Sequence, residues 1–484
     1  MTDVLVIGAG PAGMIAALCA ADLGARVALV ARTEFGGMAT NDGPVPVRTL
    51  SQGARLIREA RELGRFGGAV SESVLDYRRL LARVREVVDD ENSHVAVRQR
   101  IDALGVTIHE RAGTARFADP HTIVTGSGLR LEADKIIICT GGVSRRLPLP
   151  GFELTCTHSD AWSLTSVPPS MLVVGGGDTG LQVASIFNAF GTRIQVLEAG
   201  PRILPHADDD VAAEVATALR ASGMVVQENF GAIESFEKTA TGVRMHFAKD
   251  GRRGSVEATL AVVAVGWVAD TAGLSLSAAG VELNQRGFVK VDEYLQTSAP
   301  HVFAAGDVIG HLMLVPEAMQ DGFVAATNAV RGPIMPVGNR VSPTGSFTDP
   351  EYAQVGLTEA NARRTQDVVT AVVRFDSTTR TIIDGHKVGF CKLIADRKTS
   401  KILGCHVVGE RAVDIVQVAA IAIAGGMRVE DLARVPLSFP TYAGILVNAA
   451  AGAARQLGLT VLWQTLEGGT GVASQATRKT KEVA

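Results

Sequence analysis

The 484-residue sequence has few cysteines, few aromatic side chains and no excess of charge. Its five cysteines form no CxxC or similar redox pair, and an odd number suits reduced thiols, so we expect a cytoplasmic protein. The net charge of −3 excludes a general affinity for nucleic acid or anionic membranes. Histidines and cysteines do not cluster at ligand spacing, so we expect no metal site.

The sequence also lacks a long uninterrupted apolar run of the kind that spans a membrane. The best candidate is the stretch from Val4 to Ala21, but Asp3 precedes it and no basic segment introduces it. Gly8, Gly10 and Gly13 interrupt the run at a spacing typical of another structure. We therefore expect neither a signal peptide nor membrane insertion.

Two of the cysteines are expected to lie near each other. The stretch "KVGFCKLIADRKTSKILGCHVVG" predicts a β-hairpin that turns near Lys398 and brings Cys391 close to Cys405. A disulfide is possible there, but two small buried thiols are the interpretation that we favour.

The N-terminal stretch has the pattern of a dinucleotide-binding turn. "VLVIGAGPAG" is an apolar strand followed by a GxGxxG turn, and an Ala-rich helix and a second strand, "RVALVA", come next. This is the opening of a Rossmann unit, in which the glycines let the backbone approach a pyrophosphate at the helix N-terminus. The residues predicted to bind this pyrophosphate are Gly8, Gly10, Pro11, Ala12 and Gly13.

The same pattern returns in the middle of the chain. "MLVVGGGDTGLQVASIFNAFGTRIQVLE" contains a second strand, turn, helix and strand, and Glu198 closes it. An acid at this place hydrogen-bonds a ribose 2′-hydroxyl, which favours NADH over NADPH, although Arg202 leaves NADPH possible. The first unit has Ala31 at the equivalent place and lacks this acid. The residues predicted at the second site are Gly175, Gly177, Asp178, Thr179, Gly180 and Glu198.

A third motif indicates which cofactor each unit binds. "TSAPHVFAAGDVIG" places Asp307 after a strand and a glycine, and with "IIICTGG" and "AVVAVGWVAD" the chain resembles the flavoprotein disulfide reductases. That family includes dihydrolipoamide dehydrogenase, glutathione reductase and mercuric reductase. The resemblance, over about residues 3–455, implies FAD at the first unit and a nicotinamide cofactor at the second. It adds these cofactor-binding residues: Arg32, Gly37, Met38, Thr140, Gly141, Gly266, Gly306 and Asp307.

The resemblance also implies the domain organisation. We expect an α/β protein with two Rossmann-like dinucleotide-binding domains and a C-terminal α+β dimerisation domain. The expected bounds are 1–150 and 275–340 for the FAD domain, 151–274 for the NAD(P) domain, 341–458 for the dimerisation domain and 459–484 for a flexible tail. We expect a homodimer, because "DIVQVAAIAIAGGM" and "ILVNAAAGAA" read as interface helices that a monomer would expose.

The segment "GGMATNDGPVPVRTL" keeps the frame of the family's redox site without its sulfurs. Members of the family carry two cysteines here, which form a disulfide beside the flavin. Ala39 and Pro44 stand at these positions, and neither can form a thiolate or a mixed disulfide. The family's acid–base histidine corresponds to Phe439, and its glutamate to Gly444. Loss of the thiols and of their base together is chemically coherent.

Further departures fall on positions that the resemblance places near the flavin. Arg48 replaces a lysine and Gln182 the glutamate that pairs with it, so a permanent cation has a neutral partner. Asp178 replaces a tyrosine; it either favours the helix dipole or acts beside the nicotinamide. Phe439 and Tyr442 would reach the flavin from the second subunit, although filling an interface gap explains Phe439 equally well.

These features favour an FAD-dependent NAD(P)H oxidoreductase without a dithiol relay. The reduced flavin would pass electrons directly to a small-molecule acceptor, and an apolar cavity in place of the thiols suits a quinone or another conjugated compound. Two alternatives remain: an electron-transfer module for a protein partner, and an FAD-binding protein without turnover. Bleaching of the flavin by NADH tests the last of these, and an acceptor panel separates the first two.

Overall fold

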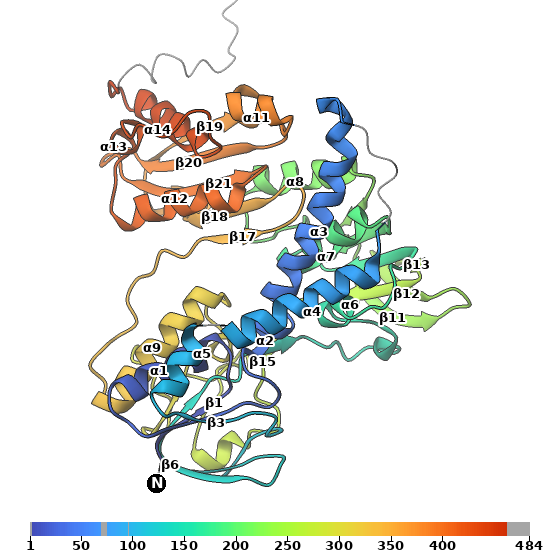
Figure 1. The fold of residues 1–484 in the computed structure, drawn as a ribbon. Helices are drawn as coiled ribbons and strands as arrows, with labels where there is room; N and C mark the ends of the chain where they lie inside the picture. The colour runs from blue at the N-terminus through green and yellow to red at the C-terminus, as the bar shows by residue number, and fades with distance from the viewer. Residues whose placement is uncertain (1, 69–74, 95, 462–484) are drawn as a thin grey trace, which may run out of the picture. The chain divides into compact units, whose positions relative to one another are not determined.

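The computed structural model describes residues 2–68, 75–94 and 96–461. These residues form two compact units (Figure 1). Among the described residues, unit 1 comprises those up to 206 with 216–342 and 346–349, and unit 2 comprises 207–215, 343–345 and 350–461. Within the described ranges, the model has no helix that is both long and apolar enough to cross a membrane. The tail expected at 459–484 lies outside the described residues from 462 onward.

The first Rossmann sheet of unit 1 has the parallel order β3–β2–β1–β6, with β16 on the other edge of β6. Its central strands are runs of Val, Leu and Ile that are almost fully buried, as expected when helices cover both faces. β6 continues into antiparallel pairing with β5 and then β4. The elements are β1 (Thr2–Ile7), α1 (Pro11–Asp22), β2 (Val27–Val30), β3 (Thr107–His109), β4 (Arg116–Asp119), β5 (Thr122–Val124), β6 (Arg130–Ile138), η3 (Leu276–Ala279), β16 (Val302–Ala304), η4 (Asp307–Ile309) and α9 (Val315–Arg331).

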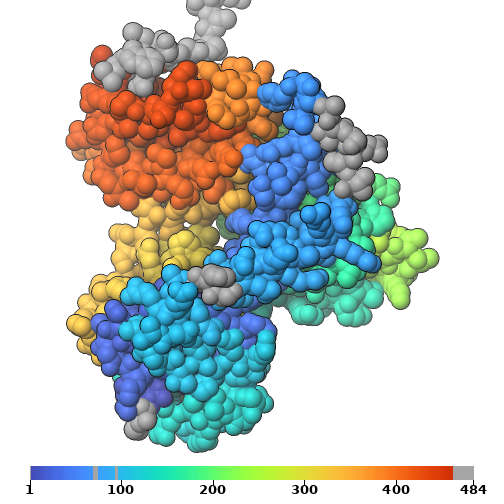
Figure 2. Space-filling view, in the orientation of Figure 1, coloured from blue at the N-terminus to red at the C-terminus, as the bar shows by residue number. Residues whose placement is uncertain are grey.

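This domain is assembled from two distant stretches of the chain. In the space-filling view, N-terminal residues in dark blue, residues near 100–140 in cyan and residues near 300–340 in yellow share one surface (Figure 2). Helix α9 packs closely on α1. A Cβ at Gly322 would lie only 2.2 Å from the Ala12 carbonyl oxygen, so this contact requires glycine. The returning segment also places Gly306 beside the first glycine-rich turn, since a Cβ there would lie 2.9 Å from the Cβ of Ala12.

A helical segment is inserted between β2 and β3 of this domain. Helix α2 carries the segment with Ala39, α3 begins at Pro44, and α4 packs against both. A side chain at Gly53 of α3 would lie 3.0 Å from Leu80 of α4, so the two helices approach closely. The elements are α2 (Gly37–Asn41), α3 (Pro44–Glu62), η1 (Leu63–Phe66), α4 (Tyr77–His94) and α5 (Ala96–Ala103).

The second Rossmann sheet repeats the order of the first, as β10–β9–β8–β14, all parallel. A three-stranded antiparallel sheet, β11–β12–β13, and a two-stranded pair, β7–β15, accompany it. The elements are β7 (Gly142–Ser144), η2 (Phe152–Leu154), α6 (His158–Trp162), β8 (Ser170–Val174), α7 (Asp178–Ala189), β9 (Arg193–Glu198), α8 (Asp209–Ala221), β10 (Val225–Glu228), β11 (Ala232–Lys238), β12 (Val243–Lys249), β13 (Arg252–Ala258), β14 (Leu260–Val263) and β15 (Trp267–Ala269).

Unit 2 is built on a five-stranded sheet of order β17–β18–β21–β20–β19. Helix α12 packs on β18 and β21, and α14 packs on β19 and β20 (Figure 1). The elements are β17 (Thr344–Ser346), β18 (Tyr352–Gly356), α10 (Glu359–Thr365), β19 (Val368–Arg374), η5 (Phe375–Ser377), α11 (Thr379–Asp384), β20 (Phe390–Asp396), β21 (Ile402–Val408), α12 (Ala412–Ala424), α13 (Val429–Ala433) and α14 (Gly444–Gln456).

The predicted fold class is confirmed, and so is the hairpin, which the structure forms from β20 and β21. Cys391 and Cys405 are free thiols with their sulfurs 4.0 Å apart, so the favoured interpretation holds. The expectation that a single chain would expose both apolar helical segments is wrong for α14. Its apolar side chains pack on the sheet of its own unit and are buried, whereas α12 leaves Ile421 73% exposed.

Candidate functional site

The first glycine-rich turn has no room for side chains. Gly8 has a φ of 107°, and a Cβ there would lie 2.2 Å from the carbonyl oxygen of Cys139. A Cβ on Gly13 would lie 1.8 Å from the carbonyl oxygen of Gly8. Helix α1 then begins at Pro11, and Gly10 before it offers no capping side chain. Its first N–H groups are therefore open to an anion, which is the arrangement that binds a pyrophosphate.

The segment that contains Ala39 lies directly on this turn. The N–H of Gly36 donates to the carbonyl oxygen of Ala9 across 2.9 Å. A Cβ on Gly37, whose φ is 57°, would lie 2.6 Å from the Cα of Gly10. The two backbones are in contact because both residues are glycine. The sequence-predicted residues Gly10 and Gly37 therefore meet at one place, although they belong to separate motifs.

Two polar groups near the same turn suit a bound FAD. The Thr140 hydroxyl is buried and has no hydrogen-bond partner among the described residues. The Asp307 carboxyl follows Gly306 at the end of β16, and burial, with the nearby charge of Asp321, raises its pKa to about 6. A buried hydroxyl and carboxylate can bond the hydroxyl and phosphate groups of a dinucleotide. The residues present thus fit FAD at the first unit.

The place of the missing ribose acid is apolar. Ala31 is 2% exposed at the end of β2 and offers no hydrogen-bonding side chain. The next residue, Arg32, forms an ion pair of 2.8 Å with Asp270, and these two side chains are 55% and 13% exposed. Arg32 was predicted to bind the cofactor, and that role stays a prediction. The ion pair with Asp270 fixes the position of the Arg32 guanidinium.

The second glycine-rich turn repeats the geometry of the first. A Cβ on Gly175, whose φ is 110°, would lie 2.3 Å from the carbonyl oxygen of Ala264. A Cβ on Gly180 would lie 2.0 Å from the carbonyl oxygen of Gly175. Helix α7 begins at Asp178, and Gly177 before it provides no side-chain cap. Because the same contacts recur at both turns, both helix N-termini present their N–H groups in the same way.

Glu198 joins the second turn to the loop that follows β9. Its carboxylate accepts from the N–H of Gly176 at 2.7 Å and from the N–H of Gly200 at 2.6 Å. The Arg202 guanidinium donates to the carbonyl oxygens of Ile203 and Leu204. These two hydrogen bonds fix the Glu198 carboxylate beside the turn. A carboxylate that selects a ribose hydroxyl must be held in this way.

Arg48 and Gln182 meet, as their positions in the two motifs predicted. The Arg48 guanidinium donates to the Gln182 side-chain oxygen at 2.8 Å and lies 3.4 Å from the centre of the Phe347 ring. The Phe347 N–H also donates to Gln182, and the Ser51 hydroxyl donates to the Phe347 carbonyl oxygen. Phe347, which lies between β17 and β18, was not predicted from the sequence.

The other three predicted catalytic residues are less closely tied to this cluster. Asp178 is exposed at the first turn of α7, and its carbonyl oxygen accepts from the Gln182 amide. Phe439 and Tyr442 belong to unit 2. The Phe439 side chain is 82% exposed, whereas the Tyr442 hydroxyl donates to Asp384 at 2.8 Å. Tyr442 is therefore engaged within its own unit, and burial raises its pKa.

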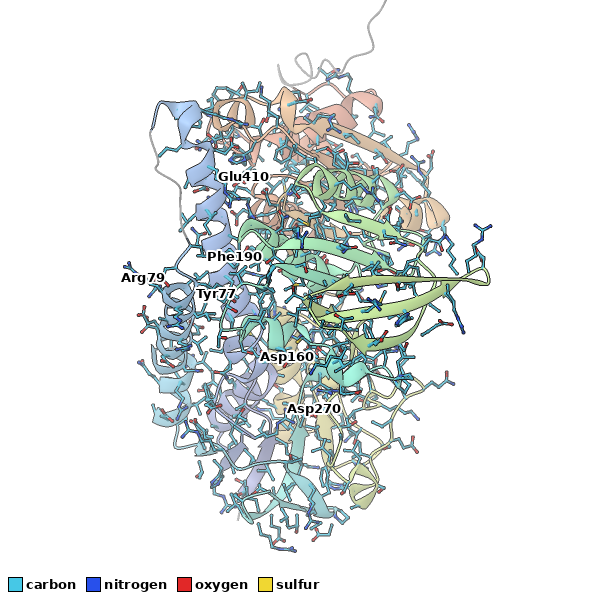
Figure 3. The ribbon with its side chains drawn as sticks, turned by 90° about the vertical axis from the view of Figure 1, so that its right-hand side faces the viewer. Tyr77, Arg79, Asp160, Phe190, Asp270 and Glu410 are labelled. Carbon is cyan, nitrogen blue, oxygen red and sulfur yellow. The ribbon has the colours of Figure 1, made fainter. Side chains whose placement is uncertain are left out.

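A second cluster of polar groups was not predicted from the sequence. Asp42 lies in the segment between Ala39 and Pro44, and its carboxylate accepts from the Ser159 hydroxyl at 2.5 Å. His158, 4% exposed, neighbours Ser159 on the short helix α6. Figure 3 labels Asp160 on the same helix. A lone acid and a histidine far along the chain gave no signal, because only the fold brings them together.

Comparison with known proteins settles the family. Residues 2–322 match the family model "Pyridine nucleotide-disulphide oxidoreductase", and residues 342–450 match its dimerisation domain. The chain belongs to this family. Members typically bind FAD and NAD(P)H, in agreement with the two turns described above. The described part of the chain holds no group of three or more His, Cys, Asp or Glu side chains arranged to bind a metal ion.

Relatives within the family span nearly the whole chain. The chain is 33% identical to dihydrolipoyl dehydrogenase 3 of Haloarcula marismortui over 470 residues, which cover 93% of this chain and 96% of the relative. It is 30% identical to a mercuric reductase of Bacillus cereus, over 91% of this chain and 70% of the relative. The solved structure of the HOCl-induced flavoprotein disulfide reductase RclA from Escherichia coli superposes with a TM-score of 0.82 at 25% identity, covering 93% and 99% of the two chains.

Proposed function

We propose that the protein is an FAD-dependent NAD(P)H oxidoreductase that passes electrons directly to a non-disulfide acceptor. The observation that carries the proposal is the pair Ala39 and Pro44, which stand in the family's redox segment while that segment still lies on the first glycine-rich turn. Neither side chain has a sulfur, so no disulfide can form between them. Both dinucleotide turns keep their glycines, so the parts needed for hydride transfer from NADH are retained.

The chain's own residues would perform binding and orientation. When bound, FAD supplies the chemistry of accepting a hydride and releasing the electrons to an acceptor. The N-terminus of α1 and Asp307 would hold FAD, and the N-terminus of α7 with Glu198 would hold NADH. Arg48, fixed by Gln182 and by the Phe347 ring, places a permanent positive charge beside the segment with Ala39.

The acceptor that suits these residues is a flat conjugated compound such as a quinone. Ala39 is partly buried and Pro44 is exposed, and both are apolar where the family has thiols. In a homodimer, which the dimerisation domain supports, Phe439 of the second copy would add an aromatic wall. Its 82% exposure in the single chain supports a role in contacts outside that chain. An apolar wall with few polar groups favours a planar organic ligand over a charged disulfide.

An acceptor panel with the purified protein tests this proposal. NADH oxidation should be fast with quinones and redox dyes, and undetectable above background with lipoamide, glutathione disulfide or other disulfides. A variant that restores both cysteines and their base, Ala39→Cys with Pro44→Cys and Phe439→His, is the matched control for the disulfide arm. Turnover of a disulfide substrate by the unmodified protein, or no turnover with any quinone or dye, would refute the proposal.

A further inference from the structure

Asp42 is joined by hydrogen bonds to a buried histidine. The Ser159 hydroxyl donates to Oδ2 of Asp42 at 2.5 Å, and the same hydroxyl oxygen lies 3.4 Å from Nε2 of His158. The other imidazole nitrogen, Nδ1, lies 3.1 Å from the Ser144 hydroxyl of β7. Asp42, Ser159, His158 and Ser144 thus form a continuous chain of polar groups, which we call the Asp42 relay.

The Asp42 relay is buried at its His158 end and partly exposed to solvent at its Asp42 end. His158 is 4% exposed, and the Trp267 ring of β15 packs edge-on against its ring at 4.9 Å. Asp42 is partly exposed, and its Oδ1 has no hydrogen-bond partner among the described residues. The open end belongs to the segment between Ala39 and Pro44, which is the segment where the acceptor is proposed to bind.

The environment of the Asp42 relay brings the proton affinities of Asp42 and His158 closer together, so the two groups can share one proton. Burial raises the pKa of Asp42 and lowers the pKa of His158, and each group's charge opposes the shift of the other. Asp160 faces both groups from α6, but the N–H and hydroxyl of Thr157 occupy its carboxylate. An acid with a raised pKa next to a histidine with a lowered one can pass a proton at small cost.

We propose that Asp42 donates the proton that the acceptor consumes and that His158, acting through Ser159, is the positioning residue that restores it. This inference rests on the proposed function. The overall reaction is NADH + H⁺ + quinone → NAD⁺ + hydroquinone. The hydride of NADH supplies both electrons and one hydrogen, and the second hydrogen is the proton that Asp42 and His158 share. Nε2 of the imidazolium gives its proton to Ser159, the Ser159 proton passes to the Asp42 carboxylate, and the O–H bond formed there breaks as the acceptor takes the proton. Solvent water at the partly exposed Asp42 carboxylate then supplies the proton that the overall reaction consumes, and this proton returns to His158 through Ser159.

The proton requirement allows a sharp kinetic test. Reduction of quinone consumes a proton, whereas one-electron reduction of ferricyanide does not. Asp42→Asn should slow quinone turnover by about 100-fold, the lower end of the range for general acids. Flavin bleaching by NADH and turnover with ferricyanide should stay within about twofold of the unmodified protein on the same grounds. Quinone turnover should also fall as pH rises in the unmodified protein, and this dependence should flatten in the variant.

Matched variants separate the relay from general damage to the site. Ser159→Ala should slow quinone turnover, whereas Ser163→Ala removes a hydroxyl that bonds only backbone carbonyl oxygens of the same helix region and should change nothing. FAD content and melting temperature of each variant, measured in parallel, show whether the fold survives.

A spectroscopic measurement tests the relay without turnover. In protein with ¹³C-labelled histidine, the NMR signal lost in His158→Asn belongs to His158. Its pKa should fall further in Asp42→Asn, because the carboxylate charge that supports the imidazolium is gone, and should not move in Ser163→Ala. An unmoved signal, or equal loss of quinone and ferricyanide turnover, would overturn the relay. Failure of the unmodified protein to reduce any quinone would instead overturn the proposed function.

Discussion

The guanidinium of Arg48 lies 3.4 Å from the centre of the Phe347 ring. Arg48 belongs to α3 and Phe347 to the segment that follows β17. The two residues are 299 positions apart in the sequence, and the guanidinium lies over the ring. A planar guanidinium suits this contact better than an ammonium group does. The Phe347 ring therefore provides a contact for the arginine that stands where the family has a lysine. This contact can be tested directly.

The Arg48–Phe347 contact should contribute measurably to stability. We expect Arg48→Met and Phe347→Leu each to lower the melting temperature, with a coupling of about 0.5–1 kcal/mol between them, as for other cation–π pairs. A double-mutant cycle on thermal unfolding measures this coupling. Arg83→Met, on an exposed arginine that pairs with Glu86, is the control. Strictly additive effects of the two substitutions would show that the contact contributes nothing.

Stability of the FAD-free protein should depend on the protonation of Asp307. Its pKa is raised to about 6, above its value in the unfolded chain, so the stabilisation is complete below about pH 4 and is lost as pH rises through 6. The full effect is at most about 3 kcal/mol, from a shift of about two units. Asp307→Asn should flatten the stability profile between pH 4 and 7, as measured by denaturant unfolding at each pH. An unchanged profile would show that the carboxyl is not buried.

The protein should use NADH better than NADPH. The Glu198 carboxylate is held by two backbone N–H groups, so a 2′-phosphate placed there would meet a fixed negative charge. Glu198→Gln should reduce the ratio of kcat/KM for NADH to that for NADPH by about tenfold, which corresponds to about 1.4 kcal/mol. Arg202→Ala should leave the ratio nearly unchanged, since the Arg202 guanidinium bonds backbone carbonyl oxygens. A wild-type preference for NADPH would contradict this assignment.

Much of the fold followed from local patterns in the sequence. The glycine spacing at Gly8 and Gly175 specified both Rossmann turns, because a strand, a turn and a helix leave a signature within a short stretch. The hairpin with Cys391 and Cys405 was visible for the same reason. The exposure of the apolar C-terminal helix was misjudged, because Ile445 and Leu446 cover a sheet that the sequence does not locate.

The parts of the site that escaped prediction depend on contacts between distant residues. Arg48 and Gln182 were found because the family pairs these two positions. Phe347, His158 and Ser159 lie far along the chain from the segments they contact, and no periodicity or spacing connects them. Such contacts follow from the packing of α6 against the end of α2 and of the segment after β17 against α3, which single-sequence patterns do not encode.

The protein should form homodimers at micromolar concentration. The chain contains the family's dimerisation domain, and Ile421 and Phe439 of unit 2 are 73% and 82% exposed. Large exposed apolar side chains of this kind are usual at subunit contacts. Ile421→Glu should shift the equilibrium toward the monomer, and Thr365→Glu on the surface helix α10 is the control. Sedimentation of the unmodified protein at the monomer mass would contradict the expectation.

The central claim is that the reduced protein stores electrons on FAD alone, since Ala39 and Pro44 provide no sulfur. Anaerobic titration with dithionite tests it most directly. The account predicts complete reduction after two electrons per FAD, without the long-wavelength absorption band that a thiolate gives beside an oxidised flavin. Uptake of four electrons per FAD, or the appearance of that band, would reveal a second redox group in the site and would contradict the claim.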